Sequence, residues 1–141
     1  MSEGIFNPEF TVDRIQATGK GTMAEVLGIE VLAVEERSVV ARMPVDHRTH
    51  QPMGILHGGA SVALAETVGS VSANGTLGPD RYAVGLEINA NHLRPVRSGW
   101  VIARSLPLHL GRTTQVWEIR ITDEQEKLVC VSRLTVAIMS R

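Results

Sequence analysis

The sequence predicts an α+β domain in which one long helix packs against an antiparallel sheet. Two β-rich stretches come first, a run in helical spacing follows, and four stretches that alternate with a period of two fill the C-terminal half. The helical run and its end, residues 58–79, carry one charged residue, Glu66, which suits a helix surrounded by protein rather than water. We expect one domain over residues 1–141, with short helical segments in residues 1–28.

The elements before the long helix are short. Segment 22–28 starts with threonine, places Glu25 three residues later and ends in glycine, which is the pattern of a capped helical turn. An earlier helix is expected near residues 11–17. Two β-rich stretches at 30–35 and 38–45, separated by polar residues, predict a hairpin that is followed by a loop.

The long helix is expected over residues 58–74, and glycine and proline beyond it end the helix. Its apolar spacing is set by Ala60, Leu64, Val68 and Val71. Because one sheet covers only one face, the opposite face must meet a partner. Small residues there would allow close approach: Gly59, Ala63, Gly69, Ser70 and Ala73. We therefore expect a homo-oligomer that is at least dimeric.

After the helix the apolar period returns to two, which predicts four further strands in hairpin-like succession. One strand around residues 100–110 stands between the alternating stretches. The apolar sets of the other three are Tyr82, Val84, Leu86 and Ile88; Trp117, Ile119 and Ile121; and Cys130, Ser132, Leu134, Val136 and Ile138.

Composition excludes several classes of function. The chain has 14 basic and 15 acidic residues and a formal net charge of −1, so no overall field attracts nucleic acid. No charge-free stretch is apolar and long enough to span a bilayer, and the N-terminus lacks a secretion signal, so we expect a cytoplasmic protein without membrane contact. The spacing of His47, His50 and His57 fits no standard zinc motif, so we expect no metal. Cys130 lies in a β pattern and is expected to be buried.

Glu66 and the preceding His-Gly-Gly suggest acyl transfer. The N–H groups of Gly58 and Gly59 would lie at the positive end of the helix dipole, where they can stabilise an oxyanion. A structural alternative is that Glu66 reaches solvent or pairs with an arginine. Gly58 and Glu66 are eight residues apart, about 12 Å along a helix, so one carbonyl cannot reach both on the same helix. Two antiparallel helices in a homodimer would bring them together in two composite sites.

Three longer segments carry a resemblance to a known family. "MPVDHRTHQPMGILHGGASVALAETVGS", "VGLEINANHLRPV" and "PLHLGR" resemble the hotdog-fold acyl-CoA thioesterases of the phenylacetate and 4-hydroxybenzoyl-CoA thioesterase group. Within it the likeness is greatest to the 1,4-dihydroxy-2-naphthoyl-CoA thioesterases and to the proofreading thioesterases of enterobactin synthesis. The resemblance implies a six-stranded antiparallel sheet wrapped around the long helix, and a dimer of dimers.

The resemblance also implies roles for individual residues. Glu66 would act as nucleophile or general base, the Gly58 N–H would polarise the thioester carbonyl, and Ser70 would help position water or the carboxylate. Gln51 and His57 would orient the thioester and the start of the helix. Contacts to coenzyme A would come from Gly85, His92, Leu93, Arg94, Pro95, His109, Leu110, Gly111, Arg112, Thr113 and Thr114. Met53 departs from the pattern, since many relatives have phenylalanine there.

Each assignment has a structural alternative. His57 would then bond only to backbone, Gln51 would be a turn residue, and His92 and Arg94 would form a solvated strand edge. With Arg97 and Arg112, however, these residues make a basic group suited to phosphates.

We expect hydrolysis of acyl-CoA thioesters, with aryl-CoA favoured and no cofactor, because coenzyme A is part of the substrate. A proofreading thioesterase that acts on acyl or aryl carrier proteins is the alternative. A hydratase or dehydratase, or a non-catalytic acyl-CoA-binding protein, would represent another class.

Overall fold

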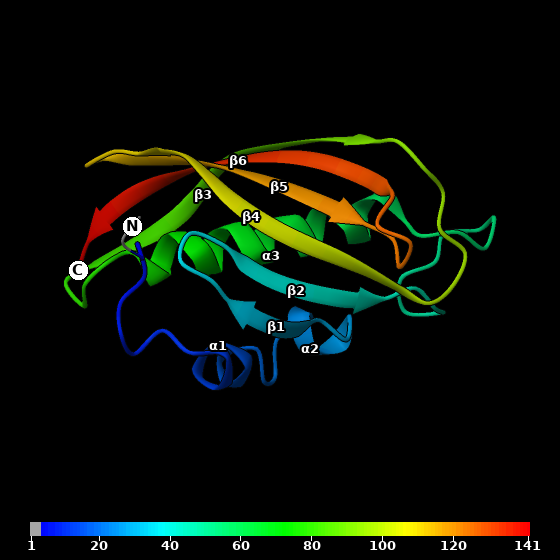
Figure 1. Ribbon diagram of the computed structural model, residues 1–141, viewed down its shortest axis with the longest axis horizontal. Coiled ribbons are helices and arrows are strands. Elements are labelled where there is room, and N and C mark those ends of the chain that lie inside the picture. Colours follow the sequence, from blue (N-terminus) through cyan, green and yellow to red (C-terminus); the bar gives the residue numbers. More distant parts are fainter. Residues whose placement is uncertain (1–3) are drawn as a thin grey trace.

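The computed structural model describes residues 4–141 and confirms the predicted α+β architecture, an antiparallel sheet of six strands wrapped around a long helix (Figure 1). The elements are α1 (Val12–Thr18), α2 (Met23–Val26), β1 (Glu30–Val34), β2 (Val39–Pro44), α3 (Gly58–Gly75), β3 (Arg81–His92), β4 (Trp100–Leu110), β5 (Thr114–Thr122) and β6 (Leu128–Ser140). Their bounds lie within two residues of the sequence-based expectation, except that β3 extends to His92 and β5 begins at Thr114, beyond the alternating stretches that predicted them.

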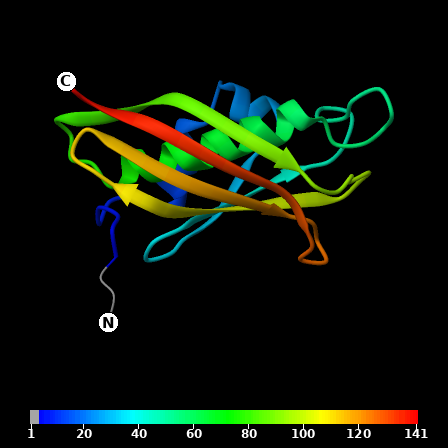
Figure 2. The ribbon, with the colours of Figure 1, turned by 90° about the horizontal axis from the view of Figure 1, so that it is seen from above.

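The strand order is β1-β2-β4-β5-β6-β3, and every neighbouring pair is antiparallel (Figure 2). The expected hairpins β1–β2, β4–β5 and β5–β6 are present. The expected hairpin-like step from β3 to β4 is wrong, because β3 pairs with β6 at the sheet edge and residues 93–99 cross to β4 between β2 and β5. A period of two specifies which face a side chain occupies, but it does not specify which strand lies beside it.

Strand β3 contains a β-bulge between Gly85 and Glu87. Gly85 pairs with Val136 and Ile88 with Leu134, both of which are fully buried, so Gly85 and Ile88 face the helix. The expected apolar face of this strand is therefore wrong in part. Tyr82 pairs with exposed Met139 on the outer face, while Val84 and Leu86 are 41% and 61% exposed. Because the bulge inserts one extra residue, side chains after it point to the opposite face from the one that strict alternation predicts.

The core lies between α3 and the concave face of the sheet. Its largest fully buried side chains are Trp117, Met43, Leu64, Ile119, Ile121 and Leu134. The Trp117 indole N–H donates to Gln115 Oε1 at 2.8 Å, so its one polar group is satisfied. Cys130 is free and buried as expected, and burial raises the pKa of its thiol, which makes it a poor nucleophile.

Two small residues of α3 face the sheet rather than a partner. Gly69 and Ala73 are buried, and a Cβ on Gly69 would lie 2.7 Å from Leu134 Cδ2. Their expected place on the opposite face is therefore wrong. A helix this poor in charge shows too little contrast between its faces for the sequence to separate them.

The N-terminal segment covers part of the remaining surface of α3. Thr11 and Thr22 cap α1 and α2, and the Phe10 ring lies against Gly75, where a Cβ would come within 2.5 Å. Side chains of α1 and α2 line a small cavity with Thr67 and Val71. The half-buried residues Val62, Glu66 and Ser70 lie on neighbouring turns of the same helix. Within residues 4–141, no helix has the length and apolar character needed to cross a membrane.

Candidate active site

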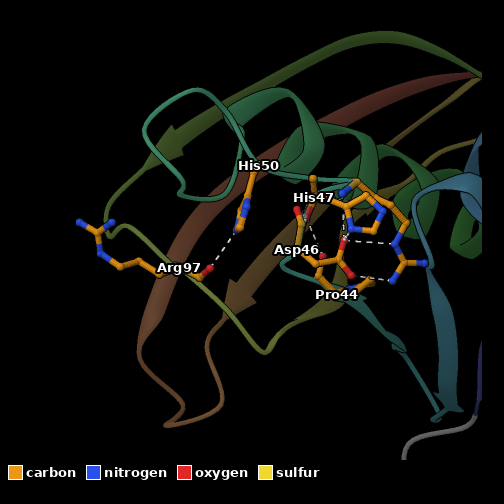
Figure 3. Close-up of polar contacts among 7 residues, drawn as sticks. Pro44, Asp46, His47, His50 and Arg97 are labelled. Carbon is orange, nitrogen blue, oxygen red and sulfur yellow. Dashed lines mark hydrogen bonds and ion pairs between the residues drawn. The ribbon is translucent and has the colours of Figure 1, made fainter.

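The loop before α3 is held by polar contacts at its start. The Arg48 guanidinium donates to both Asp46 carboxylate oxygens, at 3.1 Å from Nε and 2.7 Å from Nη2. This hydrogen bonding lowers the pKa of Asp46 to about 2. The buried Thr49 hydroxyl donates to the Pro44 carbonyl at 2.8 Å, and His50 Nε2–H donates to the Arg97 carbonyl at 2.9 Å (Figure 3). These contacts fix the segment that leads to Gln51 and α3.

The three histidines of this region do not converge. His50 is engaged with the Arg97 carbonyl, and His47 is exposed. His57 is the N-cap of α3, where its Nδ1 accepts the Gly59 N–H at 2.7 Å. Among the described residues, no group of three or more His, Cys, Asp or Glu side chains could hold a metal ion. His57 therefore fixes the start of the helix.

The Gly58 N–H is available at the first position of α3. The His57 ring accepts the Gly59 N–H. The His57 carbonyl accepts the N–H groups of Ala60 and Ser61. The Gly58 N–H has no partner among residues 4–141. The imidazole of His92, from the end of β3, lies over Gly58, where a Cβ would come within 2.9 Å of Nε2. A free donor at a helix N-terminus is suited to a developing oxyanion.

A cavity of about 370 Å³ opens beside this donor. Six of the predicted site residues line it together: Gln51, Gly58, His92, Leu93, Arg94 and Pro95. The Gln51 side-chain oxygen accepts the Met53 N–H, so the amide nitrogen of this side chain keeps its hydrogens for another acceptor. Met53 itself is 73% exposed. The loop, the first turn of α3 and the end of β3 thus form one recess with both polar and apolar walls.

Ser61 lines the same cavity and was missed by the sequence reasoning. It is 2% exposed, and its hydroxyl has no hydrogen-bond partner within the described part of the chain. Nothing in the sequence singles it out, because the same helix also carries Thr67, Ser70 and Ser72.

Glu66 lies in the middle of α3 and is half-buried. Its carboxylate forms no hydrogen bond or ion pair with any residue in 4–141, so the alternative of a structural ion pair with an arginine does not hold in the protomer. Gly85 of β3 lies directly against it, and Ser70 follows one turn later. Asn74 joins this end of α3 to β3, because its Oδ1 accepts the Ala83 N–H at 2.9 Å.

One protomer does not bring the carboxylate and the donor together. Helix α3 is continuous from Gly58 to Gly75, so the rise between Gly58 and Glu66 remains about 12 Å. Strand β3 contacts both ends of this arrangement, with Gly85 at Glu66 and His92 at Gly58.

Apart from Gly85, the predicted coenzyme A contacts fall into two groups that lie far apart. Arg94 lines the cavity beside Gly58, whereas residues 109–114 run from the end of β4 through the turn to the start of β5, at the other end of the sheet (Figure 1). At that end Arg81, the first residue of β3, donates to the Arg112 carbonyl at 3.4 Å. Eleven steps along the strand separate Arg81 from His92, about 36 Å. The expected single basic group is therefore absent from one protomer.

Comparison with known proteins agrees with the fold. The sequence model of the thioesterase superfamily matches residues 53–130, more than half of the chain. The chain belongs to the thioesterase superfamily. This thioesterase is 47% identical over 135 residues to the 1,4-dihydroxy-2-naphthoyl-CoA hydrolase of Escherichia coli, covering 96% of the chain and 99% of the relative. It is 49% identical over 135 residues to a proofreading thioesterase of Cronobacter turicensis, covering 96% and 98%.

Solved structures show the same similarity. The crystal structure of a thioesterase from Haemophilus influenzae has a TM-score of 0.94 and 51% sequence identity, and the match covers 96% of this chain and 95% of the other. The predicted hotdog fold and thioesterase family are thereby confirmed, and this thioesterase is an enzyme.

Proposed function

We propose that this thioesterase hydrolyses acyl-CoA thioesters with Glu66 as the catalytic carboxylate. The observation that carries the proposal is a half-buried carboxylate that no residue of 4–141 neutralises, on the helix whose first N–H is also free. A carboxylate without a partner keeps its lone pairs for a reacting atom. A paired one would first have to break an ion pair.

The chemistry follows from these two groups. The Gly58 N–H holds the thioester oxygen, which gains charge as the carbonyl carbon becomes tetrahedral. Glu66 either attacks that carbon or removes a proton from water, whose oxygen then attacks. Collapse of the tetrahedral species breaks the C–S bond and releases the thiol. In the nucleophilic route, water hydrolyses the resulting anhydride and frees Glu66.

The reacting pair comes from two protomers in this proposal. Because about 12 Å separates Gly58 from Glu66 on α3, the donor belongs to a facing protomer. The polar edge of β3 is unpaired within the described chain, and Val84 and Leu86 beside it are exposed. Strand-to-strand pairing at this edge would join two sheets and bury these side chains. The protein is then a dimer, or a dimer of dimers, and both groups of predicted coenzyme A contacts can serve one site from different chains.

An aryl-CoA thioester is the favoured substrate. The name of the Escherichia coli relative specifies 1,4-dihydroxy-2-naphthoyl-CoA, and that chain aligns over nearly the full length of this one. The name of the Cronobacter relative specifies proofreading, which supports carrier-bound acyl groups as the alternative. A hydratase is less well supported, because His57 Nδ1 already accepts the Gly59 N–H and caps the helix.

The test is thiol release by Glu66→Gln, which keeps the volume of the side chain and removes its charge. We expect kcat to fall at least about a hundredfold, the lower end of the loss of a positioned base. The matched control is Glu87→Gln, an exposed carboxylate on the outer face of β3. A Glu66→Gln enzyme with wild-type turnover would contradict the proposal.

The substrate is tested separately. Aryl-CoA, aliphatic acyl-CoA and acyl-carrier thioesters are compared by kcat/KM in the wild-type enzyme. The aryl-CoA thioester should have the highest value, and a carrier-bound thioester well above it would favour the proofreading alternative.

A further inference from the structure

We infer that Gly85 is a positioning residue for the Glu66 carboxylate, and that glycine is needed there because the carboxylate occupies the space of a side chain. The inference rests on the proposed role of Glu66. A Cβ on Gly85 would lie 2.6 Å from Glu66 Oε2, closer than nonbonded atoms approach. The next atom of another side chain, Leu134 Cδ1, would be 3.8 Å away, which is ordinary contact. Within residues 4–141, the carboxylate is the only obstacle to a side chain at Gly85.

Backbone conformation does not explain this glycine. The described glycines with positive φ are Gly21, Gly28, Gly54 and Gly99, and Gly85 is not among them. An L-residue can therefore adopt the conformation of Gly85 without strain.

Core packing does not explain it either. At Gly69 a Cβ would meet Leu134 and Ile119, and at Gly75 it would meet the Phe10 ring, so those glycines are required by the fold. At Gly85 the obstructing atom is the free end of a flexible side chain, which can rotate away. A methyl group at Gly85 would therefore displace the carboxylate and leave the fold intact.

The β-bulge directs Gly85 toward Glu66. Gly85 pairs with buried Val136 and so faces α3, while the extra residue, Leu86, turns the exposed Glu87 to the outer face. Without the bulge, the alternation would place Glu87 on the inner face instead of Ile88. The bulge thus keeps a second carboxylate away from the helix and places a residue without a side chain beside Glu66. Bulges often occur next to active sites, where they aim a side chain.

The experiment is Gly85→Ala in the full chain, with thiol release and thermal unfolding measured in parallel. We expect a melting temperature at or above that of the wild type, because alanine has less freedom to lose on folding. We expect kcat to fall about tenfold to a hundredfold with little change in KM, as a catalytic group displaced by about an ångström would give. The matched control is Gly4→Ala, where a Cβ would make only ordinary contacts of 3.7 Å or more and activity should not change.

A double-mutant cycle separates positioning from general distortion. In a Glu66→Gln background, Gly85→Ala should not lower the residual activity further, because the charge that it displaces is already gone. An equal loss in both backgrounds would overturn the inference, as would a rise in KM alone, which would indicate a substrate contact. A Gly85→Ala protein that does not fold would also overturn it, because the fold would then require the glycine.

The two proposals fail in different ways. An inactive Glu66→Gln enzyme together with a fully active Gly85→Ala enzyme would overturn this inference and leave the proposed function standing. A fully active Glu66→Gln enzyme would overturn both.

Discussion

The sequence drew attention to Glu66 because a single charge in a helix of small and apolar residues is conspicuous, and its catalytic role stays a prediction. The residues that lie next to it in space could not be predicted. Gly85 was named as a coenzyme A contact through family resemblance, whereas the structure places it against the carboxylate. A glycine inside a strand pattern is a signal of a bulge or a close approach. Which group approaches depends on the long-range pairing of β3 with β6, which no local pattern encodes.

The unpartnered hydroxyl of Ser61 was missed for a related reason. Serine is common in helices of small residues, and only the fold shows that this one lines the cavity beside Gly58. Residue type and spacing thus indicate what chemistry is available, while the sheet pairing decides which groups meet.

At the residue scale, we predict that Arg94→Ala and Arg112→Ala raise KM by about tenfold and lower kcat much less. Contacts to coenzyme A phosphates are equal in the ground and transition states, so their loss weakens binding uniformly. A charge-assisted hydrogen bond of about 1.5 kcal/mol gives this factor. The control is Arg120→Ala, whose exposed guanidinium pairs with Glu118 in the middle of β5. Loss of kcat at unchanged KM in Arg112→Ala would exclude a binding role.

At the element scale, capping residues and the period of apolar positions predicted the helices and strands well. Thr22 and Glu25 predicted α2, and the alternation around Trp117 predicted β5. The position of β3 was not predictable in the same way, because the alternation in its sequence is compatible with several neighbours. The loop before α3 shows no periodic pattern of apolar residues, and specific polar contacts hold its conformation.

The element-scale prediction concerns the Asp46–Arg48 contact in this loop. The pKa of Asp46 is about 2 in the folded protein and 3.8 ordinarily, so the unfolded chain binds more protons between these values. The stabilisation is therefore present above about pH 4 and is lost as pH falls through about 2. Asp46→Asn should lower the melting temperature slightly at neutral pH, because exposed ion pairs contribute little to stability.

Thermal unfolding from pH 2 to pH 7 checks this prediction. The difference between Asp46→Asn and the wild type should shrink steadily as pH falls. Glu9→Gln, which removes an exposed carboxylate that forms no hydrogen bond or ion pair within residues 4–141, serves as the control and should show no comparable trend. A difference that is the same at pH 2 and pH 7 would show that the carboxylate charge is not what stabilises the loop.

At the scale of the whole molecule, the oligomer remains a prediction with two independent supports. Glu66 and the Gly58 donor are about 12 Å apart along the axis of α3, and the edge strand β3 exposes Val84 and Leu86. Sedimentation should give a species no smaller than a dimer. A stable and fully active monomer would contradict both the composite site and the pairing of β3 edges.

If each site combines groups from two protomers, variants of Gly58 and Glu66 can test this more directly than the oligomeric state does. Gly58→Pro removes the donor N–H at the first helical position, where proline is well tolerated, and the backbone of His57 (φ −69°, ψ 131°) suits a residue before proline. Gly58→Ala is the control, because it adds a Cβ against the His92 ring in the same way but keeps the N–H. Gly58→Pro and Glu66→Gln should each be nearly inactive as homodimers, and Gly58→Ala should keep clearly more activity than Gly58→Pro.

Mixing the two inactive variants then tests where the reacting groups come from. A heterodimer of Gly58→Pro with Glu66→Gln has one site that carries both defects and one that carries neither. Random pairing makes half of the dimers heterodimers with one intact site of two, so about a quarter of wild-type activity should return. Thiol release after unfolding and refolding of the mixture, with dimers confirmed by sedimentation, measures this recovery. If folded heterodimers recover nothing, the donor and the carboxylate belong to the same chain, or Glu66 is not the catalyst.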